Sequence, residues 1–269
     1  MDLNYCTPLE RYADIWFKRE DLFSTRSPQL NRSTFTGAKL RVLSSFAWPY
    51  MQSGKTLVWY GSRSAPSMVA AASATAWGFK VCGFCPKGPP TPATGEALKL
   101  GMSLHQITHG YPSVVKKAAM DFVNASDDRL LLPFGLSSNL TVDFAEHQAL
   151  LTLKYLKGRI RRIVVVAGSG FNLAGVAKAH AVMGLGIPIM AVLVGKDCRK
   201  AVQNLVRNPH IEWVTSPLPY EKFSTYSRIN GVDVDIKYEG KAIPLLQPGD
   251  LFWLSGRYYR AVVPVERWV

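Results

Sequence analysis

A lysine near the amino end has neighbours that suit covalent chemistry. Lys39 follows Gly37 and Ala38 and precedes an apolar run. Small residues let the backbone approach a bulky ligand closely, and the long lysine side chain can then carry its amine to a carbonyl. A lysine desolvated by its surroundings can form a Schiff base with that carbonyl. Most lysines beside a glycine are solvated surface residues, so this interpretation needs support from other stretches.

A second stretch suits a phosphate group. The β-branched run 163–167 is followed by a glycine-rich segment that opens an expected helix, Gly168-Ser169-Gly170-Phe171-Asn172-Leu173-Ala174-Gly175. Glycines there let backbone N–H groups converge, and the helix N-terminus adds partial positive charge. The segment lacks the lysine and hydroxyl of a nucleotide P-loop, and no acidic residue about 20 positions on could bind a ribose. A phosphate monoester fits better than a dinucleotide, and a plain tight turn is the alternative.

A third stretch, Tyr238-Glu239-Gly240-Lys241, offers acid–base groups. A buried acid can pair with a protonated ring nitrogen, and a neighbouring tyrosine can transfer protons. Alone this is an ordinary turn. Pyridoxal phosphate, however, needs a Schiff-base lysine, a phosphate-binding segment and a partner for its pyridine nitrogen. The three stretches together supply all of these.

Alternating apolar segments predict the elements that position these residues. Strands are expected at 15–22, 57–60, 79–84, 130–135, 163–167, 189–194 and 251–254. Helices are expected from 39 to 48 and at 68–77, 93–100, 113–123, 142–156 and 173–183. This alternation favours an α/β fold with parallel sheets.

The cysteines and the apolar runs exclude several classes of protein. Cys82 and Cys85 are three apart in an expected strand, so their side chains point to opposite faces and no metal site is expected. No apolar run reaches the roughly 18 residues that span a bilayer, so no membrane partner is expected. Residues 1–4 carry no basic segment followed by an apolar one, so a cytoplasmic location is expected.

The net charge of +13 favours a polyanionic partner such as nucleic acid. The densest basic cluster joins the end of an expected helix to the start of a strand and comprises Lys154, Lys157, Arg159, Arg161 and Arg162. The alternative is a solvated helix end whose cations complement the helix dipole.

Taken in order, these stretches resemble the tryptophan-synthase-β-like (fold type II) pyridoxal-phosphate enzymes, in particular the aminocyclopropane-carboxylate deaminase and D-cysteine desulfhydrase group. That group opens with Thr-Pro-Leu-Glu-Arg and a Lys-Arg-Glu-Asp strand end, present here at 7–11 and 18–21. Gly37-Ala38-Lys39 stands where the group's cofactor lysine follows a Gly-Asn pair. The group's late Tyr-Glu-Gly-Lys is present at 238–241.

The resemblance implies a fold, a cofactor and a set of site residues. It implies two three-layer αβα domains with mostly parallel sheets and the cofactor in the cleft between them, a large domain of 1–44 plus 137–269 and a small domain of 45–136. It implies a homodimer that binds pyridoxal 5′-phosphate. The implied catalytic residues are Lys39, Tyr238 and Ser64. The implied cofactor-binding residues are Lys39, Gly168, Ser169, Gly170, Phe171, Asn172, Leu173, Glu239 and Ser255.

The chain also departs from the group's pattern. The group's Ser-Asn-His segment appears as Ser64-Ala65-Pro66, which keeps only the serine, and its late Thr-Gly-Gly turn appears as Ser255-Gly256-Arg257. These changes predict a remodelled substrate pocket.

Three functions remain open. The first is a lyase that forms an aldimine with an amino-acid group on a modified DNA base and breaks a bond at its α-carbon by decarboxylation, elimination or deamination. It resembles the role of such enzymes in bacteriophages that hypermodify thymidine, in which case the chain would act in the host cytoplasm. Arg257, Tyr258 and Arg260 could then contact a nucleotide. The second is a deaminase or desulfhydrase of a small free amino acid. The third is a relic that binds cofactor or DNA without turnover.

Overall fold

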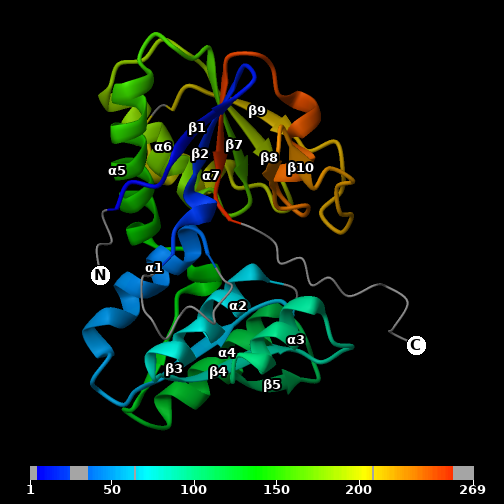
Figure 1. The fold of residues 1–269 in the computed structure, drawn as a ribbon. Coiled ribbons are helices and arrows are strands. Elements are labelled where there is room, and N and C mark those ends of the chain that lie inside the picture. Colours follow the sequence, from blue (N-terminus) through cyan, green and yellow to red (C-terminus); the bar gives the residue numbers. More distant parts are fainter. Residues whose placement is uncertain (1–4, 25–35, 64, 208, 257–269) are drawn as a thin grey trace. The chain divides into compact units, whose positions relative to one another are not determined.

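A computed structural model describes residues 5–24, 36–63, 65–207 and 209–256 (Figure 1). It divides the chain into two compact units. The described parts of the first unit are 5–24, 36–42, 137–207 and 209–256, and those of the second lie within 43–136. The chain passes from the first unit to the second within helix α1 (Ala38–Ala47).

The first unit is built on a six-stranded sheet with the order β1-β2-β12-β7-β8-β9. Its strands are β1 (Leu9–Tyr12), β2 (Ile15–Arg19), β7 (Arg162–Ala167), β8 (Ile189–Leu193), β9 (Ile211–Thr215) and β12 (Asp250–Leu254). Only β1 is antiparallel to its neighbour; the pairs from β2 to β9 are parallel. Strand β12, the last one in the described part of the chain, therefore lies between β2 and β7.

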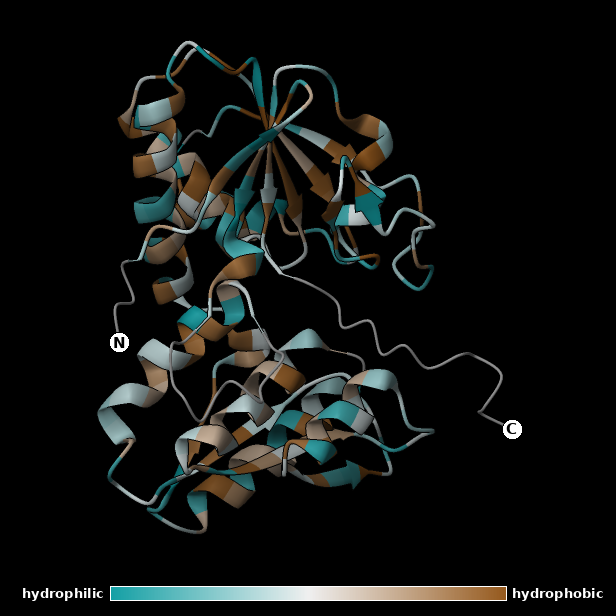
Figure 2. Cartoon of the chain, in the orientation of Figure 1, coloured by the Kyte–Doolittle hydropathy of each residue, from teal (hydrophilic) through white to brown (hydrophobic). Residues whose placement is uncertain are grey.

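Alternation along the buried strands gives this sheet two apolar faces. Val165 packs in a cluster with residues of three helices, α5 (Asn139–Leu156), α6 (Phe171–Val182) and α7 (Arg199–Leu205). Val164 belongs to a second cluster, formed with the segment that contains the hairpin β10 (Arg228–Ile229) and β11 (Val232–Asp233) and the 3-10 turns Glu239–Lys241 and Ile243–Leu245. The central strands are accordingly drawn mainly as hydrophobic in Figure 2.

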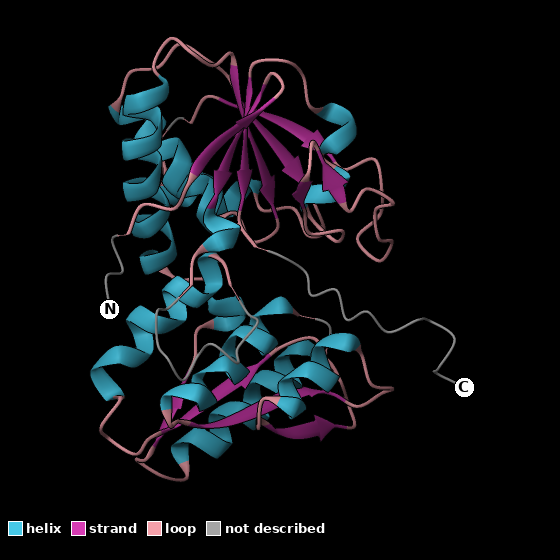
Figure 3. Cartoon of the chain, in the orientation of Figure 1, coloured by secondary structure: helices cyan, strands magenta, loops and turns pink. Residues whose placement is uncertain are grey.

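The second unit is a four-stranded parallel sheet with the order β5-β4-β3-β6 (Figure 3). Its strands are β3 (Thr56–Tyr60), β4 (Lys80–Pro86), β5 (Ser103–Ile107) and β6 (Arg129–Leu131). Helix α4 (Pro112–Asn124) covers the face of Val58 and Tyr60. Trp59 points the other way, and its indole nitrogen donates to Ser67 Oγ of α2 (Pro66–Ala72) at 3.2 Å. Helix α3 (Pro92–Lys99) packs against α2.

The predicted α/β class with mostly parallel sheets is confirmed, and several boundaries differ from expectation. The strand expected at 15–22 ends at Arg19 and continues as a 3-10 turn, and the strand expected at 130–135 ends at Leu131. The helix expected at 68–77 ends at Ala72 and continues as a 3-10 turn to Trp77. Pro133 and Gly135, the latter with a φ of 62°, explain the early end of β6.

Two absences apply to the described residues alone. None of their helices is long and apolar enough to cross a membrane. No group of three or more His, Cys, Asp or Glu among them could hold a metal ion, and the four cysteines are free. Cys85 in β4 is buried, whereas Cys82 is half-buried with its Sγ 3.0 Å from Ser103 Oγ.

Candidate active site

The backbone around Gly37 fixes Lys39 beside the carboxyl end of β12. Gly37 pairs with Gly256 in an isolated antiparallel bridge, and the N–H of Ala38 donates to the carbonyl of Ser255 at 2.9 Å. Gly37 has a φ of +114°, and a Cβ there would lie 2.9 Å from the Ser255 oxygen. Glycine is therefore required, because a side chain would break the contact that holds the first turn of α1.

Lys39 is a half-buried amine under two opposing influences. Burial lowers its pKa, and the carboxyl groups of Glu239 and Asp235 raise it in part, which leaves a pKa of about 8. A lysine in this state holds a substantial neutral fraction near pH 8. The neutral amine is the nucleophilic form that attacks a carbonyl.

Glu239 begins a 3-10 turn and is buried. Its Oε1 accepts a hydrogen bond from the N–H of Ser255 at 3.0 Å. Burial and the nearby charge of Asp235 raise the pKa of Glu239 well above its usual range, against the effect of the Ser255 N–H. Ser255 thus contacts both the Lys39 turn and the Glu239 carboxyl through its backbone.

Asp235 is a candidate site residue that the sequence prediction missed. Its buried carboxyl accepts the N–H groups of Lys237 at 2.7 Å and Tyr238 at 3.1 Å through Oδ1. Burial raises its pKa to about 7, although those N–H groups oppose the shift. Asp235 therefore fixes the turn that presents Tyr238 and Glu239. An aspartate two to three residues ahead of the motif is an Asx-turn pattern that could have revealed it.

Tyr238 connects the acidic turn to the glycine-rich loop. A Cβ on Gly168 would lie 3.1 Å from the Tyr238 ring, so the loop and the ring are immediate neighbours. The Tyr238 hydroxyl lies 3.4 Å from that of Tyr220, a second residue that the sequence prediction missed. Burial raises the pKa of Tyr238, and the neighbouring Tyr220 adds to the shift. Tyr238 therefore stays a neutral hydroxyl that can donate a proton.

The glycine-rich loop opens helix α6 as expected. Gly170 is its N-cap with a φ of 84°, so no side chain caps the first turn. A Cβ at Gly170 would lie 2.7 Å from Val202, so glycine is also needed for packing. Leu173 is buried in the helix-side cluster, so only its backbone can face a ligand. The Oγ of Ser169 lies 3.0 Å from that of Ser137, which also places the start of α5 near the loop.

A cavity of about 530 Å³ lies at the carboxyl ends of β8 and β9. Its lining includes Lys196, Asp197, Arg199 and Glu221, so it carries charges of both signs. Tyr220 also lines the cavity and, through its contact with Tyr238, joins the cavity to the candidate site.

Comparison with known proteins identifies the fold. No family model and no curated protein matches the sequence. Among solved structures, a homologue of ACC deaminase has a TM-score of 0.75 at 17% identity and covers 94% of this chain and 89% of its own. O-ureido-L-serine synthase has a TM-score of 0.72 at 15% identity, covering 98% of this chain and 93% of its own. A hydrogen sulfide-producing enzyme from Fusobacterium nucleatum has a TM-score of 0.68 at 14% identity, covering 97% and 98%.

The chain shares the fold of these structures, which is called fold type II. At these identities the likeness concerns the fold, and the site residues must be judged on their own geometry. In this fold type II chain, Lys39, the glycine-rich loop, Tyr238, Glu239 and Ser255 all lie in the first unit. The contacts above join Ala38, next to Lys39, to Ser255, Ser255 to Glu239, and Tyr238 to Gly168. Ser64, Arg257, Tyr258 and Arg260 lie outside the described residues.

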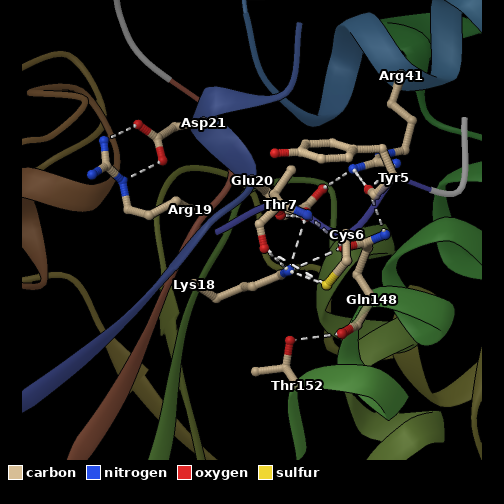
Figure 4. A network of polar contacts seen from close by, with 10 residues as sticks. All are labelled: Tyr5, Cys6, Thr7, Lys18, Arg19, Glu20, Asp21, Arg41, Gln148 and Thr152. Carbon is tan, nitrogen blue, oxygen red and sulfur yellow. Dashed lines mark hydrogen bonds and ion pairs between the residues drawn. The ribbon is translucent and has the colours of Figure 1, made fainter. Parts of the chain in front are cut away.

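A buried polar network surrounds Arg41 of α1 (Figure 4). Arg41, two residues after Lys39, donates to the carbonyl of Tyr5 at 3.1 Å and to Glu20 Oε2 at 3.3 Å. Lys18 lies 3.6 Å from Glu20 Oε1 and donates to the Thr7 carbonyl and Gln148. The side chains of these ions are almost fully buried, so each charge depends on its partners. The Lys-Arg-Glu-Asp segment therefore positions α1.

Proposed function

We propose that this chain is a pyridoxal-phosphate-dependent enzyme that breaks a bond at the α-carbon of an amino-acid group. The observation that carries the proposal is that the Ser255 backbone contacts both Ala38, the neighbour of Lys39, and the Glu239 carboxyl within one unit. It brings a lysine with a pKa of about 8 beside a buried carboxyl, as a lysine-bound cofactor with a ring nitrogen requires.

The residues present fit the cofactor. Lys39 would hold its aldehyde carbon. The N–H groups at the uncapped start of α6, from Ser169 to Asn172, would hold its phosphate. Glu239 would face its ring nitrogen, with Ser255 orienting the carboxyl. The side-chain-free Gly168 and Gly170 leave the backbone of the loop open to a bulky anion.

Pyridoxal phosphate, when bound, supplies an electron-withdrawing ring that stabilises negative charge at the α-carbon of the substrate. Glu239 would share a proton with the ring nitrogen, since burial and the nearby Asp235 raise the pKa of its carboxyl. Lys39 would take or return a proton at the α-carbon of the substrate. Tyr238 donates from its hydroxyl, and Asp235 holds Tyr238 and Glu239 in place.

We propose an amino-acid group carried on a DNA base as the substrate. The net charge of +13 supports this choice, because DNA is a polyanion. The absence of the Asn-His pair after Ser64 also supports it, because a pocket for a free amino acid would have less reason to lose that pair. Ser64 would then assist proton transfer, and Arg257, Tyr258 and Arg260 would contact the nucleotide.

A small free amino acid is the second candidate substrate. The structures with similar folds favour it, because they are a deaminase homologue, an O-ureido-L-serine synthase and a hydrogen sulfide-producing enzyme. The reaction would be deamination or desulfhydration at the same lysine.

The cofactor assignment is tested by absorbance. The purified protein, mixed with pyridoxal phosphate, should develop a visible band that borohydride bleaches and that adds the mass of the reduced cofactor to the peptide containing Lys39. Lys39→Ala should lose the band, the bleaching and the mass, whereas Lys55→Ala, at a half-buried lysine of the second unit, should keep them. A full band in Lys39→Ala would refute the site.

The substrate is tested by comparing two product assays on the cofactor-loaded protein. Mass spectrometry of nucleosides from aminoacyl-modified DNA should show a changed base, and Glu239→Gln should slow the change by about 10²-fold or more. Turnover of free D-cysteine or aminocyclopropane carboxylate, with none on DNA, would establish the second candidate instead.

A further inference from the structure

Positive charge is unevenly distributed along the first unit. The stretch 147–211 contains ten Lys or Arg residues and a single acidic residue, Asp197, whereas the whole chain has 32 basic and 19 acidic residues. Such an imbalance in one stretch creates a local positive potential that neighbouring acids of the same segment cannot cancel.

Part of this charge gathers where α5 ends and β7 begins. Lys154, Lys157 and Arg159 are exposed, and no ion pair joins them to any other residue that the structure describes. Arg162 differs, because it is half-buried and its guanidinium pairs with Asp250 at 2.7 Å. The basic cluster found in the sequence therefore separates into a structural arginine and a group of unpaired surface cations.

Aromatic rings lie among these cations. The Arg159 guanidinium lies 4.8 Å from the Tyr155 ring centre, and Tyr155 is 56% exposed. The Tyr155 ring meets Trp16 edge to face at 6.3 Å, and Arg11 lies 5.6 Å from the Trp16 ring. We call Arg11, Trp16, Lys154, Tyr155, Lys157 and Arg159 the Tyr155 surface.

The Tyr155 surface is distant from the candidate active site. It lies at the amino ends of the parallel strands, beside Trp16 of β2 and the start of β7, whereas Ser255 and Gly168 follow the carboxyl ends of β12 and β7. A strand of five or six residues spans roughly 17–20 Å. A ligand of the Tyr155 surface is therefore a second ligand or a distant part of an extended one.

We propose that the Tyr155 surface binds single-stranded nucleic acid. Unpaired Lys154, Lys157 and Arg159 match a row of phosphates, and the exposed Tyr155 ring offers a base a face on which to stack. An acidic protein segment could pair with the cations, but it would offer no base to stack on the exposed Tyr155 ring. The binding does not depend on the proposed enzymatic activity, and it would anchor a polynucleotide whose modified base reaches the candidate site.

Fluorescence anisotropy with a labelled single-stranded oligonucleotide tests the proposal on the full-length protein. The affinity should fall as salt rises from roughly 50 to 200 mM, and the slope of log K against log salt should drop by about 1 for each phosphate-binding cation removed. Lys157→Gln/Arg159→Gln should weaken binding at least about tenfold at low salt. Lys99→Gln/Lys116→Gln, which removes the same charge from exposed positions of the second unit, should change it less than about twofold.

The aromatic contribution is separated by two further variants. Tyr155→Leu should weaken binding of the single strand by about fivefold or more and that of duplex DNA little, whereas Tyr155→Phe should bind as the wild type does. The proposal would be overturned if the two lysine and arginine double variants lost equal affinity, if polyglutamate bound as tightly as the oligonucleotide, or if no binding occurred at low salt. The visible cofactor band of each variant is recorded in parallel, so failure here is distinguishable from failure of the cofactor site.

Discussion

The amine of Lys39 is sensitive to the charge state of its neighbours. Burial lowers the pKa to about 8, and ionised Glu239 and Asp235 raise it. Below that pH the amine is mainly protonated and inert toward a carbonyl, and above it the neutral form dominates. Capture of the cofactor by Lys39 is therefore predicted to follow the titration of this one group.

The first prediction concerns the rate of that capture. Mixed with pyridoxal phosphate, cofactor-free protein should develop its visible band faster as pH rises, with a midpoint near 8. Asp235→Asn removes a negative charge that raises the Lys39 pKa but keeps the Oδ1 acceptor, so its midpoint should be lower. Stopped-flow absorbance measures both. A midpoint above about 10, the value of a solvated lysine, would contradict the burial of this amine.

A second prediction follows from the raised pKa of Asp235. In the unfolded chain this group titrates near its ordinary value of 3.8, and in the folded chain at about 7. Between those values the folded state binds more protons, so its contribution to the free energy of unfolding falls as pH rises from about 4 to 7. Urea denaturation of cofactor-free protein should show this decline between pH 5 and pH 7, and Asp235→Asn should flatten it. An unchanged profile in the variant would assign the pH dependence to other groups.

The third prediction concerns the buried ion pair of Arg41 and Glu20. Arg41→Met leaves Glu20 with Lys18 as its one cationic partner among the residues that the structure describes, so the free energy of unfolding should fall by about 3 kcal/mol. Adding Glu20→Gln removes the uncompensated charge and should recover part of the loss. Chemical denaturation of the two variants measures this coupling. Additive losses would show that the two side chains act independently.

At the level of elements, sequence reasoning succeeded where burial is continuous. The strands at 163–167 and 189–193 are buried at nearly every position, so each is an unbroken apolar run. The missed strands Ser103–Ile107 and Ile211–Thr215 are edge strands of their sheets and are partly exposed, and polar residues interrupt the apolar run in each. The two-residue strands of the 228–233 hairpin have no periodicity to detect.

The candidate site was predictable only in part for a related reason. Lys39, the glycine-rich loop and Glu239 belong to motifs with local signatures, and the structure brings them together in the first unit. Asp235 makes a local Asx-turn contact that was overlooked, whereas Tyr220 acts through a contact that depends on how the 216–239 segment folds. No local pattern pairs Tyr220 with Tyr238, which lies eighteen residues later.

The fourth prediction tests the packing of α5 against α6. A Cβ on Gly175 would lie 2.4 Å from the Val142 carbonyl oxygen and 2.7 Å from the Glu146 nitrogen, both of them backbone atoms of α5. Gly175→Ala should therefore destabilise the protein by about 1–3 kcal/mol. The matched variant Gly95→Ala, in helix α3 with open space around it, should stabilise by about 0.5–1 kcal/mol. Thermal and urea denaturation compare them, and a neutral Gly175→Ala would contradict the close helix contact.

At the scale of the whole molecule, the two units differ in continuity. The second unit draws its sheet and its helices α2, α3 and α4 from one uninterrupted stretch, whereas the first needs segments from both sides of it. We predict that a fragment of residues 43–136 folds alone, with a cooperative thermal transition by circular dichroism and dispersed amide signals by NMR. A fragment ending at 124, without the β6 neighbour of β3, should lose cooperativity. A structureless 43–136 fragment would show that the unit depends on the rest of the chain.

The placement of β12 has a consequence for synthesis on the ribosome. Residues 250–254 form the strand that joins β2 to β7, so until they leave the exit tunnel the nascent chain carries two half-sheets with exposed inner edges. The Ser255 backbone, which contacts Ala38 beside Lys39 and the Glu239 carboxyl, follows this strand directly and is therefore made after both of them. The candidate site is complete only once this strand has been made, and a ribosome-stalled product lacking it would expose those edges to aggregation.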